Sequence, residues 1–201
     1  AEKLRPRSLD EVVGQSQIQE QLRPILKQNH PVSMIFWGPP GSGKTTVAEI
    51  LSTHFHANFI KLNAVESGSK LLKEIGEKAR SDRLQFRSVT ILFVDEIHRW
   101  NKAQQDILLP FIEKGDLILI GATTENPSYS LNRALLSRCR MIVFKNISDG
   151  DLKNLSNKAF LNFGLNLENV LDLEAQAYLI SCAGGDARRL ISTVESICGH
   201  L

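Results

Sequence analysis

The sequence predicts an α/β fold in which a five-stranded parallel sheet is followed by a small all-helical domain. Five short apolar runs are the candidate strands: 34–37, 58–62, 89–94, 117–120 and 141–144. Continuous apolar runs of this kind are typical of strands buried on both faces of a parallel sheet. Amphipathic stretches alternate with the runs, which is the pattern of a doubly wound domain.

The stretches with helical periodicity lie between the strand candidates, at 45–55, 67–83 and 101–114. Gly76 weakens the second stretch, and Pro110 is expected to kink the third. Three further helical stretches, with no strand between them, follow Lys145, at 151–163, 173–183 and 186–199. We therefore predict an α/β core over residues 1–146 and a helical domain over residues 147–201.

The composition is that of a globular protein. Apolar residues make up 42% of the 201 residues, charged residues make up 23%, and the formal net charge is +2. The sequence has no run of 18 apolar residues and no basic, apolar leader, so we expect neither a membrane span nor secretion. Cys139, Cys182 and Cys198 lack CxxC or metal-ligand spacing and are expected to be reduced thiols. Both ends suggest a piece excised from a longer chain.

A phosphate-binding motif follows the first candidate strand. The run that fits GxxxxGK[ST] is Gly38-Pro39-Pro40-Gly41-Ser42-Gly43-Lys44-Thr45, and Thr46 comes next in the predicted helix. Its glycines let backbone N–H groups turn towards phosphates at a helix N-terminus. Lys44 is predicted to reach the outer phosphates, and the Thr45 hydroxyl is predicted to bind Mg²⁺.

An acidic pair, Asp95-Glu96, ends the third apolar run. A strand that ends in this way brings carboxylates to the edge of the sheet beside the phosphate loop. We predict that Asp95 holds the metal and that Glu96 is the general base for an attacking water. The alternative is that the pair caps the next helix and faces solvent.

The acidic pair also separates the nucleotide-binding classes. A small-molecule kinase does not need Glu96, and the run from Asn101 to Gln104 lacks the aspartate of a guanine-reading NKxD motif. ATP hydrolysis is therefore favoured, and ATP and Mg²⁺ are the expected cofactors.

Four further segments resemble clamp-loader-like AAA+ ATPases. Residues 119–128 (LIGATTENPS) resemble the sensor strand, 136–139 (LSRC) the SRC motif, and 184–189 (GGDARR) the sensor-two helix. Together with 95–106 (DEIHRWNKAQQD), they resemble the RarA/MgsA family, which includes the Werner-helicase-interacting ATPase. The likeness runs from about Leu4 to the end of the chain. It implies a P-loop AAA+ core followed by a helical lid.

The resemblance implies roles for residues outside the phosphate loop. Thr123, or its neighbour Thr124, is expected to contact the attacking water or the γ-phosphate. Arg138 is expected to act in trans as an arginine finger on the ATP of an adjacent subunit. Arg188 is expected to reach the γ-phosphate from the lid of its own subunit, with Arg189 as the open alternative.

Three more segments have an implied place around the site. Asn63, at the end of the second strand, is implied as a glutamate switch that holds Glu96 away from the water. The segment Val13-Gly14-Gln15 is expected near the adenine. His98 is expected to pack beside the site or to act as a cap, with no chemistry assigned to it, and nucleic-acid sensing is the alternative. Trp100 is expected to have a packing role.

The resemblance also implies an ATPase that acts on DNA in replication-fork maintenance, recombination and repair. The implied partners are forked, gapped or single-strand-containing DNA, gripped through its backbone, and single-strand-binding protein or a polymerase. Self-association as a homo-oligomer, a tetramer in full length, is also implied, through a C-terminal domain that we expect this chain to lack. A bacterial member is expected in the cytoplasm or nucleoid, and a eukaryotic member in the nucleus.

The residues themselves add little support for DNA binding. Lys3, Arg5 and Arg7 form a basic start, and Arg99 and Lys102 follow the acidic strand. Solvated surface is the alternative for each of these residues.

Two alternative functions remain open. One is a clamp-loader ATPase subunit, although residues 45–88 contain no cysteine for the zinc site of the bacterial motor subunit. The other is an ATP-gated binding switch with negligible turnover, against which Glu96 argues. A Holliday-junction branch-migration motor also carries an Ala-Thr-Thr sensor, but its pattern is not found in this chain, which has Ser137-Arg138-Cys139 at that position.

Overall fold

The computed structural model describes residues 4–28 and 30–200. Its strands are β1 (Met34–Trp37), β2 (Asn58–Asn63), β3 (Thr90–Asp95), β4 (Ile118–Thr123) and β5 (Arg140–Val143). All neighbouring strands pair in parallel, in the order β2-β3-β4-β1-β5. The predicted five-stranded parallel sheet is confirmed, and each strand begins and ends within three residues of its apolar run.

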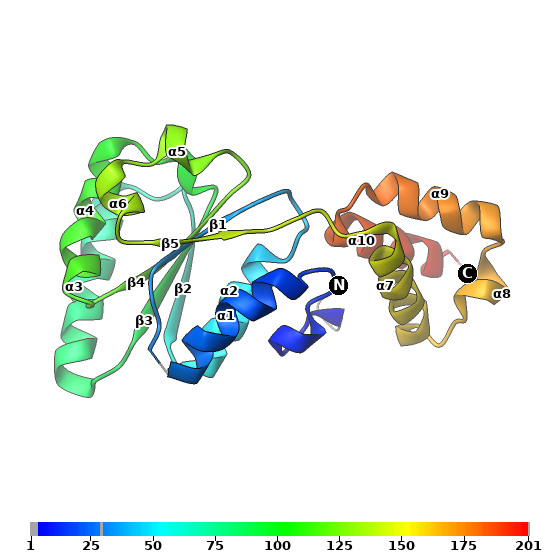
Figure 1. The fold of residues 1–201 in the computed structure, drawn as a ribbon, viewed down its shortest axis with the longest axis horizontal. Coiled ribbons are helices and arrows are strands. Elements are labelled where there is room, and N and C mark those ends of the chain that lie inside the picture. The colour runs from blue at the N-terminus through cyan, green and yellow to red at the C-terminus, as the bar shows by residue number, and fades with distance from the viewer. Residues whose placement is uncertain (1–3, 29, 201) are drawn as a thin grey trace.

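Helices cover both faces of the sheet (Figure 1). On one face lie α1 (Ser16–Gln28) and α2 (Lys44–His54), and on the other lie α3 (Ser69–Phe86) and α4 (Lys102–Glu113). The short elements of the core are η2 (Leu9–Glu11), η3 (Ile97–Arg99), α5 (Pro127–Ser130) and α6 (Arg133–Leu136). The α4 helix continues through Pro110.

The α1 helix and the short elements were not predicted from the sequence. Only Ile18, Leu22 and Ile25 of α1 are buried, and the helix contains Pro24. Its apolar stripe is therefore narrow and interrupted by a residue that normally breaks helices. Tertiary packing stabilises it, because the three buried side chains join the cluster between the sheet and α2.

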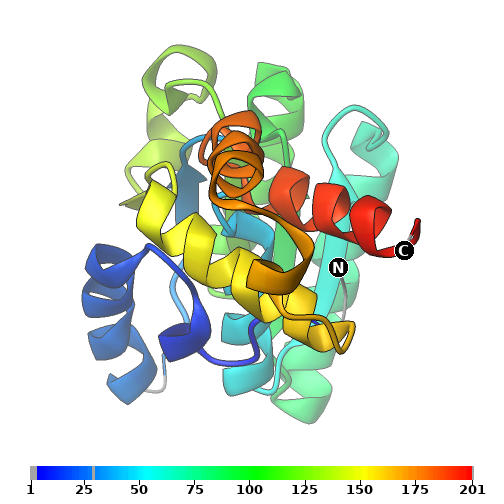
Figure 2. The same ribbon diagram turned by 90° about the vertical axis from the view of Figure 1, so that its right-hand side faces the viewer.

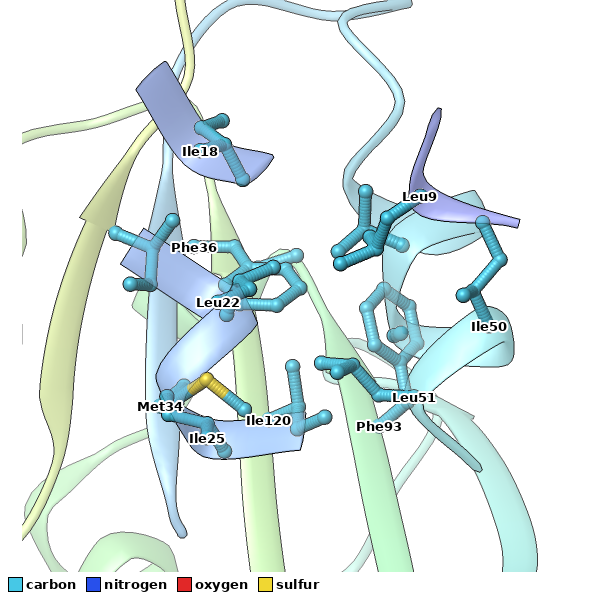
Figure 3. Packing of buried hydrophobic residues seen from close by; sticks show 14 of the residues in the cluster. Leu9, Ile18, Leu22, Ile25, Met34, Phe36, Ile50, Leu51, Phe93 and Ile120 are labelled. Carbon is cyan, nitrogen blue, oxygen red and sulfur yellow. The ribbon is translucent and has the colours of Figure 1, made fainter. Parts of the chain in front are cut away.

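The core between α1, α2 and the sheet is closely packed (Figure 3). Leu22 from α1 points towards Phe36 of β1, and Leu51 from α2 lies beside Phe93 of β3. All four side chains are fully buried. Burial of each contributes roughly 1.5–3 kcal/mol relative to exposure. This packing holds β1 and β3, and thus the loops at their carboxyl ends, in place.

After β5 the chain enters an all-helical part (Figures 1 and 2). Its helices are α7 (Asp149–Asn162), α8 (Leu167–Val170), α9 (Leu173–Ala183) and α10 (Ala187–Cys198). It has its own apolar cluster, with Leu152, Phe160 and Leu190 fully buried. The predicted helical lid is confirmed, with α8 as an addition, while the domain division at 146/147 stays a prediction. No helix among the described residues is both long and apolar enough to cross a membrane.

Gly76 is required for the contact between α3 and α4. A Cβ atom at this position would lie 2.4 Å from the ring of Phe111 on α4. The glycine that weakens α3 by helix propensity thus allows the two helices to approach closely.

We expect Gly76→Ala to lower stability, because overpacking costs about 1–3 kcal/mol while the gain in helix propensity is about 1 kcal/mol. Gly150→Ala in α7 is the matched control, because a Cβ atom there would meet nothing within 4 Å. The control is expected to be neutral or up to about 1 kcal/mol more stable. Urea unfolding of both variants measures the difference, and equal stability would contradict the packing role of Gly76.

Candidate nucleotide site

Three strand ends create the site. The phosphate loop, residues 38–45, follows β1, the pair Asp95-Glu96 ends β3, and the pair Thr123-Thr124 ends β4. Since β4 lies between β1 and β3, these segments meet at one edge of the sheet. Ligands of doubly wound sheets bind in this position, outside the carboxyl ends of the strands.

A cavity of about 520 Å³ lies between the phosphate loop, the N-terminal segment and the lid. Its size is in the range of small-molecule sites, which is roughly 300–1,000 Å³. The predicted site residues that line it are Val13, Pro40, Gly41, Ser42, Gly43, Lys44, Thr45, Thr46, Asp95, Glu96, Thr124 and Arg188. The predicted residues outside the lining are Gly14, Gly38, Pro39, Asn63, Thr123 and Arg138.

Lys44 begins α2 and is almost completely buried beneath the phosphate loop. Its Nζ donates hydrogen bonds to the carbonyl oxygens of Gly38 at 2.8 Å and Pro39 at 2.7 Å. Burial lowers the pKa of Lys44, and the carboxylates of Asp95 and Glu96 oppose that shift. The ammonium group is thus held between the loop and the acidic pair, where a phosphate anion would gain most from it.

The lid rests directly on the phosphate loop at Gly41. This glycine has φ +64°, and a Cβ atom on it would lie 1.7 Å from Oδ1 of Asp186. The Ala187 N–H donates to the Gly41 carbonyl oxygen at 3.3 Å. Arg188, in the first turn of α10, thereby reaches the cavity lining, while Arg189 is not among the lining residues.

Glu96 has a strained backbone. Its φ is +54° and its ψ +41°, which is the left-handed region that residues other than glycine rarely occupy. Its N–H lies 3.2 Å from Oδ1 of Asp95. Such a conformation costs on the order of 1–3 kcal/mol, and it persists where the surrounding structure enforces it, often at active sites. Here it turns the chain into η3 and leaves both carboxylates on the cavity.

His98 lies beside the site, as the sequence predicts, but its polar contacts there were not predicted. Its side chain is 4% exposed, and its Nε2 lies 3.3 Å from Oε2 of Glu96 and 3.4 Å from Oε1 of Glu125. Its Nδ1 lies 3.0 Å from Oγ1 of Thr123. Only its closeness to the acidic pair in sequence could have signalled this, because the contacts depend on the turn at Glu96. Trp100, as expected, packs in the core, where its Nε1 donates to Ser67.

The two threonines at the end of β4 differ in position. Thr123 is fully buried, and its Oγ1 accepts the Glu125 N–H at 3.0 Å in addition to contacting His98. Thr124 lines the cavity. Of the two threonines that the sequence offers as the γ-phosphate contact, Thr124 is the one on the cavity, and the choice between them stays a prediction.

Asn63 ends β2 opposite Asp95 in the strand register. Its Oδ1 accepts the Val65 N–H at 3.0 Å, within its own turn. The Asn63 side chain thus bonds within its own turn, while the Glu96 carboxylate contacts His98. The switch role of Asn63 stays a prediction.

The N-terminal segment forms one wall of the cavity. Val13 lines it, while Gly14 packs beside Ile147, which precedes α7, and Asp151 in the first turn of α7. The buried Gln15 donates through Nε2 to the Lys145 carbonyl oxygen at 2.8 Å, which ties this segment to the chain that enters the lid.

Part of the predicted basic start also faces this cavity. Arg5 and Arg7 both line it, and Arg5 forms an ion pair with Glu49 of α2. Lys3 lies outside the described residues. The sequence offered only exposed surface or DNA contact for these arginines, because their charge pattern gives no sign of the fold-back onto the cavity.

Arg138 lies away from the cavity of its own chain. It follows α6, which is at the end of the core opposite the lid (Figure 1). Its Nη2 lies 2.5 Å from Oε1 of Glu113, and its Nη1 donates to the Ala134 carbonyl oxygen at 2.7 Å. Half-exposed ion pairs contribute only about 0–1 kcal/mol, so another anion could replace Glu113 at little cost.

The fold and this cavity define a P-loop nucleotide-binding domain with a helical lid. The chain belongs to the AAA family, described as "ATPase family associated with various cellular activities (AAA)", which matches residues 34–147. The matched description names ATPases, which agrees with the ATPase class that the sequence predicts.

Similar proteins with assigned names indicate which group of AAA ATPases this chain resembles. The chain is 44% identical to "Replication-associated recombination protein A" of Haemophilus influenzae, over 97% of this chain and 45% of the relative. It is 42% identical to "ATPase WRNIP1" of Dictyostelium discoideum, over 97% of this chain and 23% of the relative. These relatives confirm the RarA/MgsA resemblance. The chain spans about half the length of the bacterial relative.

A solved structure agrees with the fold. The "RuvB Holliday junction branch migration motor" of Thermotoga maritima matches with a TM-score of 0.77 and 27% identity, over 96% of this chain and 64% of that chain. The match covers both the sheet and the lid, and it supports the AAA+ fold class.

Burial of the Cys139 thiol, which follows Arg138, should lower its reactivity. All three cysteines are free, and burial raises the pKa of Cys139 to about 12. At pH 9 we expect Cys139 to react with iodoacetamide at least about 10-fold more slowly than in urea, because the thiolate is the nucleophile.

The raised pKa of Cys139 also makes the free energy of unfolding depend on pH. The unfolded thiol has a pKa of 9.0 and the folded one about 12, so the folded state holds the proton longer. The contribution of the Cys139 thiol to the free energy of unfolding is therefore fully present below pH 9 and is lost as the pH rises towards 12. Labelling followed by mass spectrometry, with Cys139→Ala as the control, tests the burial. Equal rates in folded and unfolded protein would contradict it.

Proposed function

We propose that this chain hydrolyses Mg·ATP in the cavity between the phosphate loop and the lid, with Glu96 as the general base. The observation that carries the proposal is that the Glu96 carboxylate lines the same cavity as Lys44 and Arg188. A base on one wall and cations on two others fit an attacking water, a γ-phosphate and a transition state that gains negative charge.

The phosphate loop supplies the binding site for the triphosphate. Backbone N–H groups at the start of α2 point at the anion, and Lys44 exchanges its two carbonyl contacts for phosphate oxygens. Val13 provides apolar contact for the adenine of ATP. Gly14, Gly38 and Pro39 do not line the cavity, and we propose that they support the residues that do. Gly38 allows Phe144 to approach the loop, because a Cβ atom on Gly38 would lie 2.4 Å from the Phe144 carbonyl oxygen.

The Thr45 hydroxyl and the Asp95 carboxylate both line the cavity, and oxygen donors of this kind suit Mg²⁺. When bound, Mg²⁺ would neutralise charge on the phosphate oxygens. Thr124 is the residue of the β4 pair that we assign to the γ-phosphate or the water, because it lines the cavity and Thr123 does not.

The proposed arginine finger needs a second copy of the chain. Arg138 lies at the opposite end of the core from the lid, so it would serve the cavity of a neighbour (Figure 1). It would exchange its contact with Glu113 for the γ-phosphate of that neighbour. Hydrolysis should then depend on assembly.

We expect the ATP turnover per chain to rise with protein concentration, and to fall at least about 100-fold in Glu96→Gln and Arg138→Ala. Arg80→Ala, an exposed arginine on α3, is the matched control and should turn over like the wild type. Steady-state phosphate release over a wide concentration range measures this dependence.

Two other results of the same assay would contradict the proposal. A rate that is independent of concentration and unaffected by Arg138→Ala would mean that no finger acts in trans. Tight ATP binding with negligible turnover in the full-length protein would favour the ATP-gated binding switch.

We also propose that turnover acts on DNA at replication or recombination structures. The support comes from the names of two similar proteins, a replication-associated recombination protein and a Holliday junction branch migration motor. DNA held through its backbone, assembly into an oligomer such as a tetramer, and contact with single-strand-binding protein or a polymerase belong to the same proposal. So does a place in the cytoplasm or nucleoid of a bacterium, or in the nucleus of a eukaryote.

The DNA proposal predicts a specific stimulation. Forked or gapped DNA should raise turnover several-fold over blunt duplex of the same length, and added salt should weaken the effect steeply, because backbone contacts release counterions. Phosphate release with each DNA at two salt concentrations checks this. Stimulation that needs a sliding clamp with primed template would instead favour a clamp-loader subunit.

A further inference from the structure

We propose that His98 is a positioning residue that holds the Glu96 carboxylate in place for hydrolysis and connects it to Thr123 at the end of β4. This inference rests on the proposed role of Glu96 as the general base. The sequence predicts packing or capping for this histidine, with nucleic-acid sensing as the alternative, and assigns it no part in hydrolysis.

The contacts of His98 point in two directions. Nε2 faces Glu96 at 3.3 Å and Glu125 at 3.4 Å, while Nδ1 faces the Thr123 hydroxyl at 3.0 Å. The imidazole itself is 4% exposed, whereas the Glu96 side chain is 38% exposed. A buried ring therefore contacts a carboxylate that is open to the cavity.

The hydrogen bonds have one arrangement that satisfies every group with a neutral ring. The Thr123 oxygen accepts the Glu125 N–H, so its own hydrogen is free to go to Nδ1 of His98. Nε2 then carries the ring hydrogen and donates it towards Glu96. If the threonine instead donated to the Glu125 carbonyl oxygen at 3.1 Å, Nδ1 would have to donate, and a neutral ring would turn a lone pair towards two carboxylates.

Glu96 needs such a partner. Among the residues that the structure describes, His98 is the one side chain in hydrogen-bond or ion-pair contact with its carboxylate. A partly exposed glutamate otherwise samples several rotamers, and a base that is misplaced by about 1 Å can lose 100-fold in rate. The left-handed backbone at Glu96 brings His98 back beneath the carboxylate.

Thr123 acts in this arrangement through His98. It is fully buried outside the cavity lining, so its hydroxyl contacts the imidazole and the Glu125 backbone. Glu125 lies in the turn between β4 and α5. A displacement of that turn would reach Glu96 through two successive contacts, Thr123 to His98 and His98 to Glu96.

Four variants of the full-length protein test the proposal, with kcat, KM and the Kd of a non-hydrolysable ATP analogue as readouts. His98→Ala should lower kcat at least about 10-fold and leave KM and Kd within about 2-fold, because the loss concerns the base and not nucleotide binding. His98→Gln, whose amide N–H can stand at the place of Nε2, should recover most of kcat. His98→Asn, which reaches only the place of Nδ1, should not.

The fourth variant is Trp100→Phe, the matched control. It removes a buried hydrogen bond at the end of the same short helix, η3, without touching Glu96. It should keep the wild-type kcat. An equal fall in Trp100→Phe and His98→Ala would mean that η3 is merely loosened, which overturns the proposal.

A double mutant separates positioning from an independent role. If His98 acts through Glu96, adding His98→Ala to Glu96→Gln should change kcat by no more than about 2-fold. A further 10-fold fall in the double mutant would overturn the proposal, and so would an unchanged or raised kcat in His98→Ala alone.

The two levels of inference can fail separately. If Glu96→Gln turns over like the wild type, the base role fails, and the His98 proposal fails with it. If Glu96→Gln is inactive while His98→Ala is unaffected, the proposed function stands and only the His98 proposal fails.

Discussion

The parallel pairing of β3, β4 and β1 is the constraint on which the rest of the molecule depends. Carboxyl ends of parallel strands face the same edge of a sheet, so the order β2-β3-β4-β1-β5 brings the acidic pair, the threonine pair and the phosphate loop together. Both faces of the sheet must be covered by helices to support this pairing, and the two apolar clusters do so. The nucleotide cavity follows from that arrangement.

The contact between the lid and the phosphate loop links ligand binding to lid position. The Asp186 carboxylate, which caps α10, occupies the space next to Gly41, and the Ala187 N–H bonds to the Gly41 carbonyl oxygen. A nucleotide on the loop would therefore act on the first turn of α10, where Arg188 faces the cavity. Such a direct contact is a physical basis for a nucleotide-dependent lid angle.

The acidic pair shows how local strain and a buried ring work together. Glu96 has a backbone conformation that a glutamate does not prefer, and this conformation directs η3 under the site. His98 then bridges Glu96 and Thr123, which are 27 residues apart in the chain by their numbers. Glu96, His98 and the Thr123 hydroxyl at the end of β4 are thus connected by direct polar contacts.

The sheet, the phosphate loop and the acidic pair could be predicted from the sequence alone, because each depends on a local pattern. These patterns are the apolar runs, the glycine spacing and a strand that ends in carboxylates. Three features depend on tertiary structure instead: the polar α1 helix, the fold-back of Arg5 and Arg7 onto the cavity, and the exposure of Thr124 rather than Thr123 to the cavity. So do the polar contacts of His98. These features depend on which side chains meet across the fold, and contacts between residues distant in sequence leave no periodic signal in the chain.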